Sequence, residues 1–339
     1  MTKRFMLLVL TLLFVSLISQ TNSYAQTTLR FSSFMSPESA PHENYALWAK
    51  EVEQKTNGRV KIALYPSEAL GKAKDHYEMV SQGIVDIAWF TLGFTPGRFP
   101  LSSVLELPME IPSATPYGLT VWDIYEKYLQ PEFKDVKILA LYGLDPYCVY
   151  TTRKPVRKLE DIKGMKIRAA VPMQIKITQA WGAAPVQLPT SDVYDAMNRG
   201  LVDGALLPYA AIKDFRAHEV SKFITDVKLF SYPCGFGINK KVFDGLPPDV
   251  KKIIDDLSGK RVVERGGKII DGITAQNLEI AKKAGVEQIL LAPAERARWL
   301  KACDPVIEQS LKDLESKGLP AKKVYEEAKV ILKKYSTNP

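Results

Sequence analysis

The stretches "YEMVSQGIVDIAWF" (residues 77–90) and "YDAMNRGLVDGALL" (residues 194–207) carry the same pattern at two distant places in the chain. Each has a tyrosine, a glycine six positions later, Val-Asp two positions after that, and an alanine at the same offset. The pattern is typical of an amphipathic helix that ends at a glycine suited to the left-handed C-cap and is followed by a buried strand. The repeat therefore predicts two lobes that contain the same helix–glycine–strand unit.

Strand-like runs and helical patterns alternate around the first copy. "TTLRFSSF" and "GRVKIALYP" flank a helical pattern over residues 42–56, and a helix through "KDHYEMVSQG" precedes "VDIAWF". Such alternation predicts an α/β fold with helices on both faces of a parallel or mixed sheet. The last third is helical, with a long helix from about residue 247, a weak point in it at Gly266-Gly267, and helices over about 294–317 and 321–335.

The amino terminus resembles an export signal. Lys3 and Arg4 precede an apolar run from Phe5 to about Ile18, and polar residues then lead to the small-residue ending Ser23-Tyr24-Ala25. This arrangement predicts a secretory signal peptide over residues 1–25, cleaved before Gln26. An uncleaved anchor is the alternative, but the apolar run is shorter than the roughly 20 residues that span a bilayer. We therefore expect an exported protein.

The charge pattern and the missing motifs exclude several classes of function. The net charge of +8 is spread along stretches such as "AKKVYEEAKVILKKY", where bases alternate with acids, so it indicates a solvated surface and no nucleic-acid partner. The three histidines have no metal-ligand spacing, and "GFGINK" fails the dinucleotide fingerprint because Lys240 replaces its third glycine. No nucleophile, base and orienting group come together, so we expect no metal, no cofactor and no enzyme.

One arginine is a candidate for ligand binding. In "LEDIKGMKIRAAVP" (residues 159–172), Arg168 ends a short apolar run that follows a Lys-Gly turn. Such an arginine is either a solvated charge at a strand end, the commoner case, or a fork that holds a carboxylate. The two repeated strands lead into residues 89–91 and 206–209, which would lie at carboxyl ends of sheet strands, where open α/β sheets border the ligand crevice. Ordinary core packing is the alternative for these residues.

Four longer stretches resemble one family of proteins. They are "NGRVKIALYPSEALGKAKDHYEMVSQGIVDIA", "RKPVRKLEDIKGMKIRAA", "GAAPVQLPTSDVYDAMNRGLVDGALL" and "FGINKKVFDGLPPDVKKII". In combination they resemble the extracytoplasmic solute-binding proteins of tripartite ATP-independent periplasmic (TRAP) transporters, over essentially the whole mature chain. The resemblance implies a two-lobed periplasmic binding protein fold, in which each lobe is a mixed sheet flanked by helices and the ligand cleft lies between the lobes.

The resemblance also implies an organisation and partners. We expect lobe I to comprise residues 27–147 and 238–275, and lobe II residues 148–237 and 276–339. Hinge bending would occur at the strands around residues 147–151 and 233–237 and at the long helix from about residue 247. The expected partners are a small-molecule carboxylate and the small and large membrane subunits of a TRAP transporter, and the expected state is a monomer.

Arg168 stands where the family clamps the ligand's carboxylate. Sialic-acid-binding members carry a second arginine where this chain has Tyr147-Cys148, a Glu-Asn pair where it has Leu206-Leu207, and an asparagine where it has Phe34. These departures replace polar contacts with apolar walls, so we expect an apolar, aromatic or alicyclic monocarboxylate. The full set of expected ligand-binding residues is Arg168, Tyr147, Phe34, Trp89, Phe90, Thr91, Met173, Thr190, Leu206, Leu207, Tyr209 and Tyr232.

Two further questions stay open at this point. Cys148 and Cys234 flank the expected inter-lobe strands and could form a disulfide, although small buried hydrophobic side chains are the favoured interpretation. An exported enzyme that uses Arg168 as substrate clamp and Asp86 or Asp203 as base is the alternative function. Both aspartates follow valine in the repeated unit, which favours a shared structural role.

Overall fold

The computed structural model describes residues 26–337. The expected signal peptide, residues 1–25, lies outside the described residues. Among residues 26–337, no helix is long and apolar enough to cross a membrane.

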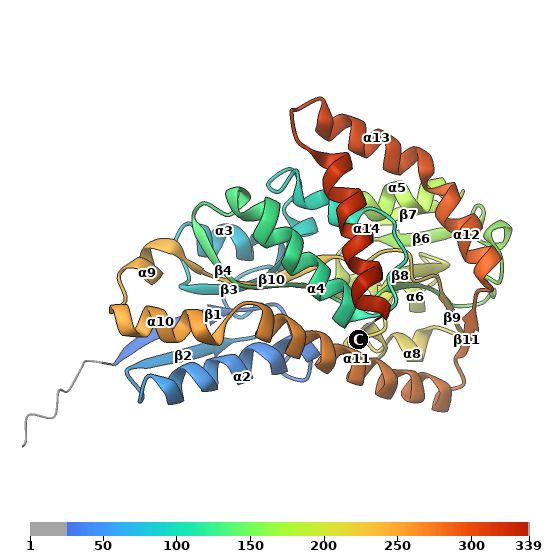
Figure 1. Cartoon of the computed structure of the whole chain (residues 1–339). Helices are drawn as coiled ribbons and strands as arrows, with labels where there is room; N and C mark the ends of the chain where they lie inside the picture. Colours follow the sequence, from blue (N-terminus) through green and yellow to red (C-terminus); the bar gives the residue numbers. More distant parts are fainter. Residues whose placement is uncertain (1–25, 338–339) are drawn as a thin grey trace, which may run out of the picture.

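The described residues form two mixed sheets, each flanked by helices, which confirms the α/β class and the two lobes (Figure 1). The sheet of lobe I has the order β2-β1-β3-β10-β4, and that of lobe II has the order β11-β9-β5-β8-β6-β7. The strands of lobe I are β1 (Thr27–Ser32), β2 (Val60–Tyr65), β3 (Ile87–Thr91), β4 (Val136–Gly143) and β10 (Pro233–Asn239). Those of lobe II are β5 (Tyr147–Thr151), β6 (Lys166–Ala169), β7 (Ala184–Gln187), β8 (Gly204–Pro208), β9 (Phe223–Asp226) and β11 (Glu287–Leu290).

The repeated stretches occupy equivalent places in the two sheets. β3 lies between β1 and β10, and β8 lies between β6 and β5; in each case the first neighbour is parallel and the second antiparallel. Gly83 and Gly200, which end the preceding helices, have φ values of 74° and 70°. The N–H of the residue after each glycine donates to the carbonyl of the residue five positions before it, at 2.9 Å, as expected where a helix ends in a residue of left-handed conformation. The predicted helix–glycine–strand unit is therefore present in both lobes.

The aspartates of the repeat have the same structural role in both lobes. The backbone N–H of Arg30 donates to Asp86 Oδ2 at 2.7 Å, and the N–H of Asp86 donates to the carbonyl of Arg30 at 3.2 Å. The N–H of Lys166 likewise donates to Asp203 Oδ2 at 2.8 Å, and the N–H of Asp203 returns a bond of 2.8 Å. Each carboxylate thus ties its strand to the neighbouring parallel strand. Neither residue lines the cavity that contains Arg168.

The helices cover both sheets and cross between the lobes (Figure 1). They are α2 (Ala40–Lys55), α3 (His76–Ser81), α4 (Ala114–Ile124), α5 (Pro172–Ala180), α6 (Val193–Asn198), α7 (Ala211–Asp214), α8 (Ala217–Val220), α9 (Lys240–Asp244), α10 (Pro248–Leu257), α11 (Lys260–Lys283), α12 (Pro293–Ala302), α13 (Asp304–Glu315) and α14 (Ala321–Thr337).

The expected long helix is interrupted at a different place from the predicted one. It divides into α10 and α11 at Gly259, whose φ is 75°, and α11 runs unbroken through Gly266 and Gly267. A Cβ at Gly266 would lie 2.4 Å from the side chain of Asn44, and one at Gly267 would lie 2.6 Å from the backbone of Thr115. The glycine pair therefore permits close helix packing, and the predicted weak point there is wrong.

Two of the expected lobe boundaries differ from the structure. The boundary at residues 237/238 falls inside β10, which pairs with β3 and β4 along its length and so belongs to lobe I. The chain crosses between the sheets in residues 144–146 and 227–232, just before the strands that were expected to be the hinges. The C-terminal helix α14 was expected in lobe II but packs against α4 of lobe I. Figure 1 shows α14 (red) beside α4.

The three cysteines, all within the described residues, are free and buried. Cys234 belongs to the large apolar core that extends from lobe I, whereas Cys148 belongs to a second apolar cluster in lobe II. The favoured interpretation of both as small buried hydrophobic side chains agrees with this arrangement, and the alternative of a Cys148–Cys234 disulfide does not.

Candidate functional site

Arg168 is held at the end of β6 by contacts with the loop that follows β7. On β6, Arg168 pairs in register with Val186 of β7 and with Ala205 of β8. Its side chain is only 1% exposed. The Nε–H donates to the carbonyl of Leu188 at 3.1 Å, and Nη2 donates to Thr190 Oγ1 at 2.8 Å. These two bonds orient one edge of the guanidinium.

The other edge of the Arg168 guanidinium has no counter-charge. Within residues 26–337, Arg168 makes no ion pair, and Nη1 makes no hydrogen bond. Burial lowers the pKa of Arg168 to about 10, although Tyr147, Asp192 and Tyr232 act in the opposite direction. A guanidinium with a pKa near 10 stays charged at neutral pH. The site therefore presents a buried cation with free N–H donors, which is the arrangement a carboxylate ligand completes.

Arg168 faces an enclosed cavity of about 60 Å³ between the two lobes. Both lobes and the crossing segments contribute to its wall. Eight of the twelve residues expected to bind the ligand line this cavity: Phe34, Trp89, Thr91, Tyr147, Arg168, Thr190, Leu207 and Tyr232.

Aromatic rings form two groups in the cavity wall. On the lobe I side, Phe34 meets Trp89 edge-on at a centroid distance of 4.9 Å and lies 5.6 Å from Phe94. At the crossing segments, Tyr147 meets Tyr232 edge-on at 5.1 Å. Burial raises the pKa of the Tyr147 hydroxyl above its ordinary value, so this hydroxyl remains protonated beside Arg168. The wall offers ring faces and edges for an apolar ligand body.

Four of the expected residues do not line this cavity. Phe90 lies on the opposite face of β3 from Trp89, with its ring packed edge-on against Tyr77 at 5.1 Å. Leu206 alternates with Leu207 along β8 and is buried in the large apolar core. The Tyr209 hydroxyl accepts a hydrogen bond from Gln288 at 3.1 Å.

The fourth of these residues is Met173, which lines a neighbouring hollow of about 270 Å³. Glu106 lines the same hollow, and in the described part of the chain it makes no hydrogen bond or ion pair. Burial raises the pKa of Glu106 to about 8. This hollow therefore contains a carboxyl group that is protonated over most of the neutral range.

The cavity also contains residues that sequence reasoning missed. Phe94 and Phe215 follow β3 and β8, at the strand ends where a ligand crevice was expected, but no pattern singled them out. Gln174 lies in the first turn of α5, the helix that follows the strand of Arg168, and its side chain accepts a hydrogen bond from the N–H of Ala170 at 2.6 Å. Asp145 and Asp214 are the acidic members of the wall.

Both of these carboxyl groups are perturbed. Burial raises the pKa of Asp145 to about 7; the nearby Asp214 also raises it, and the N–H groups of Ala210, Asp145 and Tyr209 oppose the shift. Burial raises the pKa of Asp214 to about 6, against the effect of Lys213. The signal for Asp145 was present in the sequence, as a single acid between two strand-like runs in "LYGLDPYCVY".

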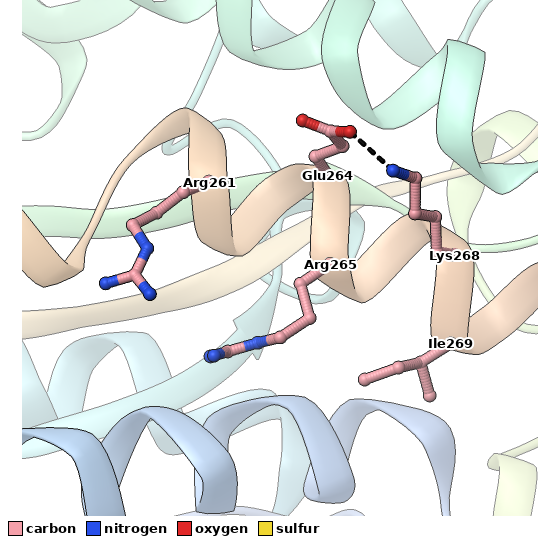
Figure 2. A pocket seen from close by; sticks show the side chains of 5 residues that line it. All are labelled: Arg261, Glu264, Arg265, Lys268 and Ile269. Atoms are coloured by element: carbon pink, nitrogen blue, oxygen red, sulfur yellow. Dashed lines mark hydrogen bonds and ion pairs between the residues drawn. The ribbon is translucent and has the colours of Figure 1, made fainter.

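A second group of arginines lies on the outer surface and differs from Arg168. Figure 2 shows a hollow of about 420 Å³ on α11, where Arg261, Arg265 and Ile269 point toward α2. Both arginines already pair with Glu51 of α2, at 3.3 and 3.0 Å. Their carboxylate-binding capacity is therefore used within the protein. No group of three or more His, Cys, Asp or Glu side chains in residues 26–337 is placed to hold a metal ion.

Comparison with known proteins places the chain in one family. The model of DctP, bacterial extracellular solute-binding protein, family 7, matches residues 31–313. The 2,3-diketo-L-gulonate-binding periplasmic protein YiaO of Escherichia coli (strain K12) is 28% identical over 281 residues, which make up 79% of this chain and 83% of that protein.

Solved structures give the same assignment. A TRAP solute-binding protein from Rhodoferax ferrireducens T118, in complex with copurified benzoate, superposes with a TM-score of 0.86 at 28% identity, over 92% of this chain and 99% of that one. A marine metagenome TRAP solute-binding protein specific for aromatic acid ligands, in complex with 3-hydroxybenzoate, gives 0.87 at 28% identity, over 91% and 99%. The chain therefore belongs to the family 7 bacterial extracellular solute-binding proteins, and it is a TRAP transporter solute-binding protein and not an enzyme.

Proposed function

We propose that this protein captures an aromatic or alicyclic monocarboxylate in the cavity around Arg168 and delivers it to the membrane subunits of a TRAP transporter. The carboxylate takes the free N–H groups of Arg168, with the hydroxyl of Tyr147 or Thr91 beside them. The ligand's ring lies against the aromatic wall. Export with removal of residues 1–25 places the monomeric protein in the periplasm, where the small and large membrane subunits receive the ligand.

The observation that carries this proposal is the buried guanidinium of Arg168 without a carboxylate partner. Burying a charged group costs several kcal/mol unless an opposite charge pairs with it. A buried arginine without such a partner is therefore suited to bind an anion. Paired N–H donors of arginine match a carboxylate, and the bond is stronger in a dry cleft than at the surface. Arg261 and Arg265, which line the hollow on α11, already pair with a carboxylate, and Arg296, which lines another hollow, is only half-buried, so its charge stays closer to water than that of Arg168.

The apolar wall selects the body of the ligand. Burying a six-membered hydrocarbon ring removes on the order of 100 Å² of apolar surface from water, which at about 25 cal/mol/Å² contributes about 2.5 kcal/mol. Two polar side chains of the wall, Thr190 and Gln174, already form hydrogen bonds within the protein, and each hydroxyl of a sugar acid that stays unmatched in the cavity costs about 1–3 kcal/mol. Relatives fit both classes by name, a diketo-gulonate for YiaO and benzoate or 3-hydroxybenzoate for two structural neighbours. The wall of Phe34, Trp89 and Phe94 favours the aromatic class here.

A thermal-shift panel tests the ligand class. We expect benzoate and cyclohexanecarboxylate to raise the melting temperature of the ligand-free mature protein. Sialic acid, gluconate and C4 dicarboxylates should have little effect, because a second carboxylate would find no second arginine in the cavity. If a dicarboxylate or a sugar acid gives the largest shift and the apolar acids give none, the ligand class is wrong.

Calorimetry on arginine variants tests the clamp. We expect Arg168→Ala to abolish benzoate binding and Arg168→Lys to remove most of it, because lysine cannot reproduce two parallel N–H donors. Arg265→Ala is the matched control, since it removes an arginine that is already paired with Glu51, and it should bind benzoate like the wild type. Near-native affinity in a folded Arg168→Ala protein would place the clamp elsewhere.

A further inference from the structure

The cavity that holds Arg168 has an acidic residue with an unused oxygen. Asp145 lies in residues 144–146, where the chain crosses from β4 to β5, and its side chain is 1% exposed. The N–H of Ala210 donates to Oδ2 at 3.1 Å. Oδ1 is buried and has no hydrogen-bond partner among the residues that the structure describes. A buried carboxyl oxygen without a partner costs about 1–3 kcal/mol, so it calls for an explanation.

Asp145 and Arg168 line the same cavity, but among the described residues they make no hydrogen bond or ion pair with each other. The neighbouring charge that acts on Asp145 is a second acid of the cavity wall, Asp214. Arg168 is bound to the loop that follows β7, whereas Asp145 is bound to Ala210 before α7, so the cation and the acid of the cavity wall are held by different segments.

The hydrogen bond to the residue before a short helix involves only one of the two oxygens of the Asp145 carboxyl group. Ala210 directly precedes α7, and the bond from its N–H to Oδ2 ties the crossing segment to that helix. Asparagine would make the same bond with its amide oxygen. The second oxygen serves no such purpose, and it belongs to a residue that lines the ligand cavity.

We propose that Asp145 is a specificity residue: its Oδ1 accepts a hydrogen bond from a hydroxyl group that the ligand carries on the side remote from its carboxylate. This inference rests on the proposed function, because it takes Arg168 as the site of the carboxylate. The preferred substrate class becomes a hydroxylated aromatic or alicyclic monocarboxylate. Unsubstituted acids bind through Arg168 and the wall alone.

Calorimetry with matched ligands tests the inference. The probes are benzoate and its 3- and 4-hydroxy and 3- and 4-methoxy derivatives, titrated into ligand-free mature protein. A methoxy group keeps the oxygen on the ring but has no O–H to donate. We expect at least one hydroxybenzoate to bind the wild type tenfold or more tightly than benzoate and tenfold or more tightly than its methoxy counterpart.

Asp145→Asn isolates the role of the carboxylate. The amide oxygen can keep the bond from Ala210, and the amide NH₂ then faces the ligand as a donor. We expect the hydroxy-to-methoxy preference to fall to threefold or less. Asp226→Asn is the matched control: Asp226 is also 1% exposed with an unpartnered Oδ1, but it pairs with Lys228 at 3.4 Å and does not line the cavity. This variant should keep the wild-type preference.

The outcomes separate this inference from the proposed function. If benzoate binds through Arg168 but no hydroxybenzoate exceeds it in the wild type, the role of Asp145 is wrong and the clamp stands. The same conclusion follows if folded Asp145→Asn keeps the full preference. The wild-type comparison alone is decisive if Asp145→Asn does not fold. If no acid of the series binds, or if Arg168→Ala binds them like the wild type, both proposals are wrong.

Discussion

Replacing Arg168 by methionine should close the cleft of the ligand-free protein. Methionine fills a similar length of the cavity and has no charge to desolvate. In the structure, where the lobes surround Arg168, burial lowers the pKa of Arg168 from 12.5 to about 10. At about 1.4 kcal/mol per pKa unit, this difference of 2.5 units corresponds to roughly 3.5 kcal/mol, which disfavours closure of the cleft around an unpaired Arg168. The guanidinium is charged in both arrangements below about pH 10, so the cost is the same across the neutral range.

Part of this gain is offset by the hydrogen bonds that the variant loses. The carbonyl of Leu188 and the hydroxyl of Thr190 lose their donor, at a cost of about 0.5–1.5 kcal/mol each if nothing replaces it. Both residues are only half-buried, so water can reach them and reduce the cost. The net shift is about 1–3 kcal/mol toward the closed form. At the upper end, a closed fraction of about 1% in the wild type becomes about half in the variant.

Small-angle X-ray scattering measures this change as a smaller radius of gyration. Wild-type protein without and with benzoate provides the open and closed references, and Arg265→Met controls for the loss of an arginine whose charge is already paired. We expect ligand-free Arg168→Met to lie between the two references and to be unaffected by benzoate. A ligand-free variant with the radius of the ligand-free wild type would refute the argument that the unpaired guanidinium holds the cleft open.

Two further predictions concern stability. Burial raises the pKa of Glu106 to about 8, above its ordinary value of 4.5, so this carboxyl contributes stability that is complete below about pH 4.5 and is lost as the pH rises through about 8. We expect the melting temperature of the wild type to fall between pH 5 and 9, with Asp145 and Asp214 adding to the slope near their pKa values of about 7 and 6. Glu106→Gln should make the melting temperature depend less on pH, and an unchanged slope in this variant would contradict the assignment. Asp203→Ala should cost about 0.5–1.5 kcal/mol of unfolding free energy, because it removes the hydrogen bond from the exposed N–H of Lys166, which water can then satisfy. Benzoate affinity should be retained, and a loss of affinity in the folded variant, measured by calorimetry, would show a role of Asp203 in binding.

The fold could be predicted largely because its decisive signals are local. A glycine that ends a helix and a valine-aspartate pair that begins a strand act within a few residues, and both copies of the repeat fold accordingly. Sheet membership is a different kind of information. β10 is a strand whichever sheet it joins, and only its pairing with β3 and β4, residues distant in sequence, assigns it to lobe I. The amphipathic pattern of α14 likewise predicts a helix but not the lobe whose surface it covers.

The candidate site shows a similar limit on a smaller scale. All five residues of β3 are buried, so no polar alternation reveals that Trp89 faces the cavity while Phe90 faces the core behind it. The role of Asp145 is hard to predict for a different reason, because its place in the sequence is compatible with two structural roles. An acid before proline is ordinary turn chemistry, and a lone acid between two apolar runs is also the mark of a buried polar contact. The structure shows one oxygen in a turn-like bond to Ala210 and the other without a partner, so the two roles apply to different atoms of the same side chain. Its second oxygen therefore becomes a binding group only in the context of the cavity, which residues from both lobes create together.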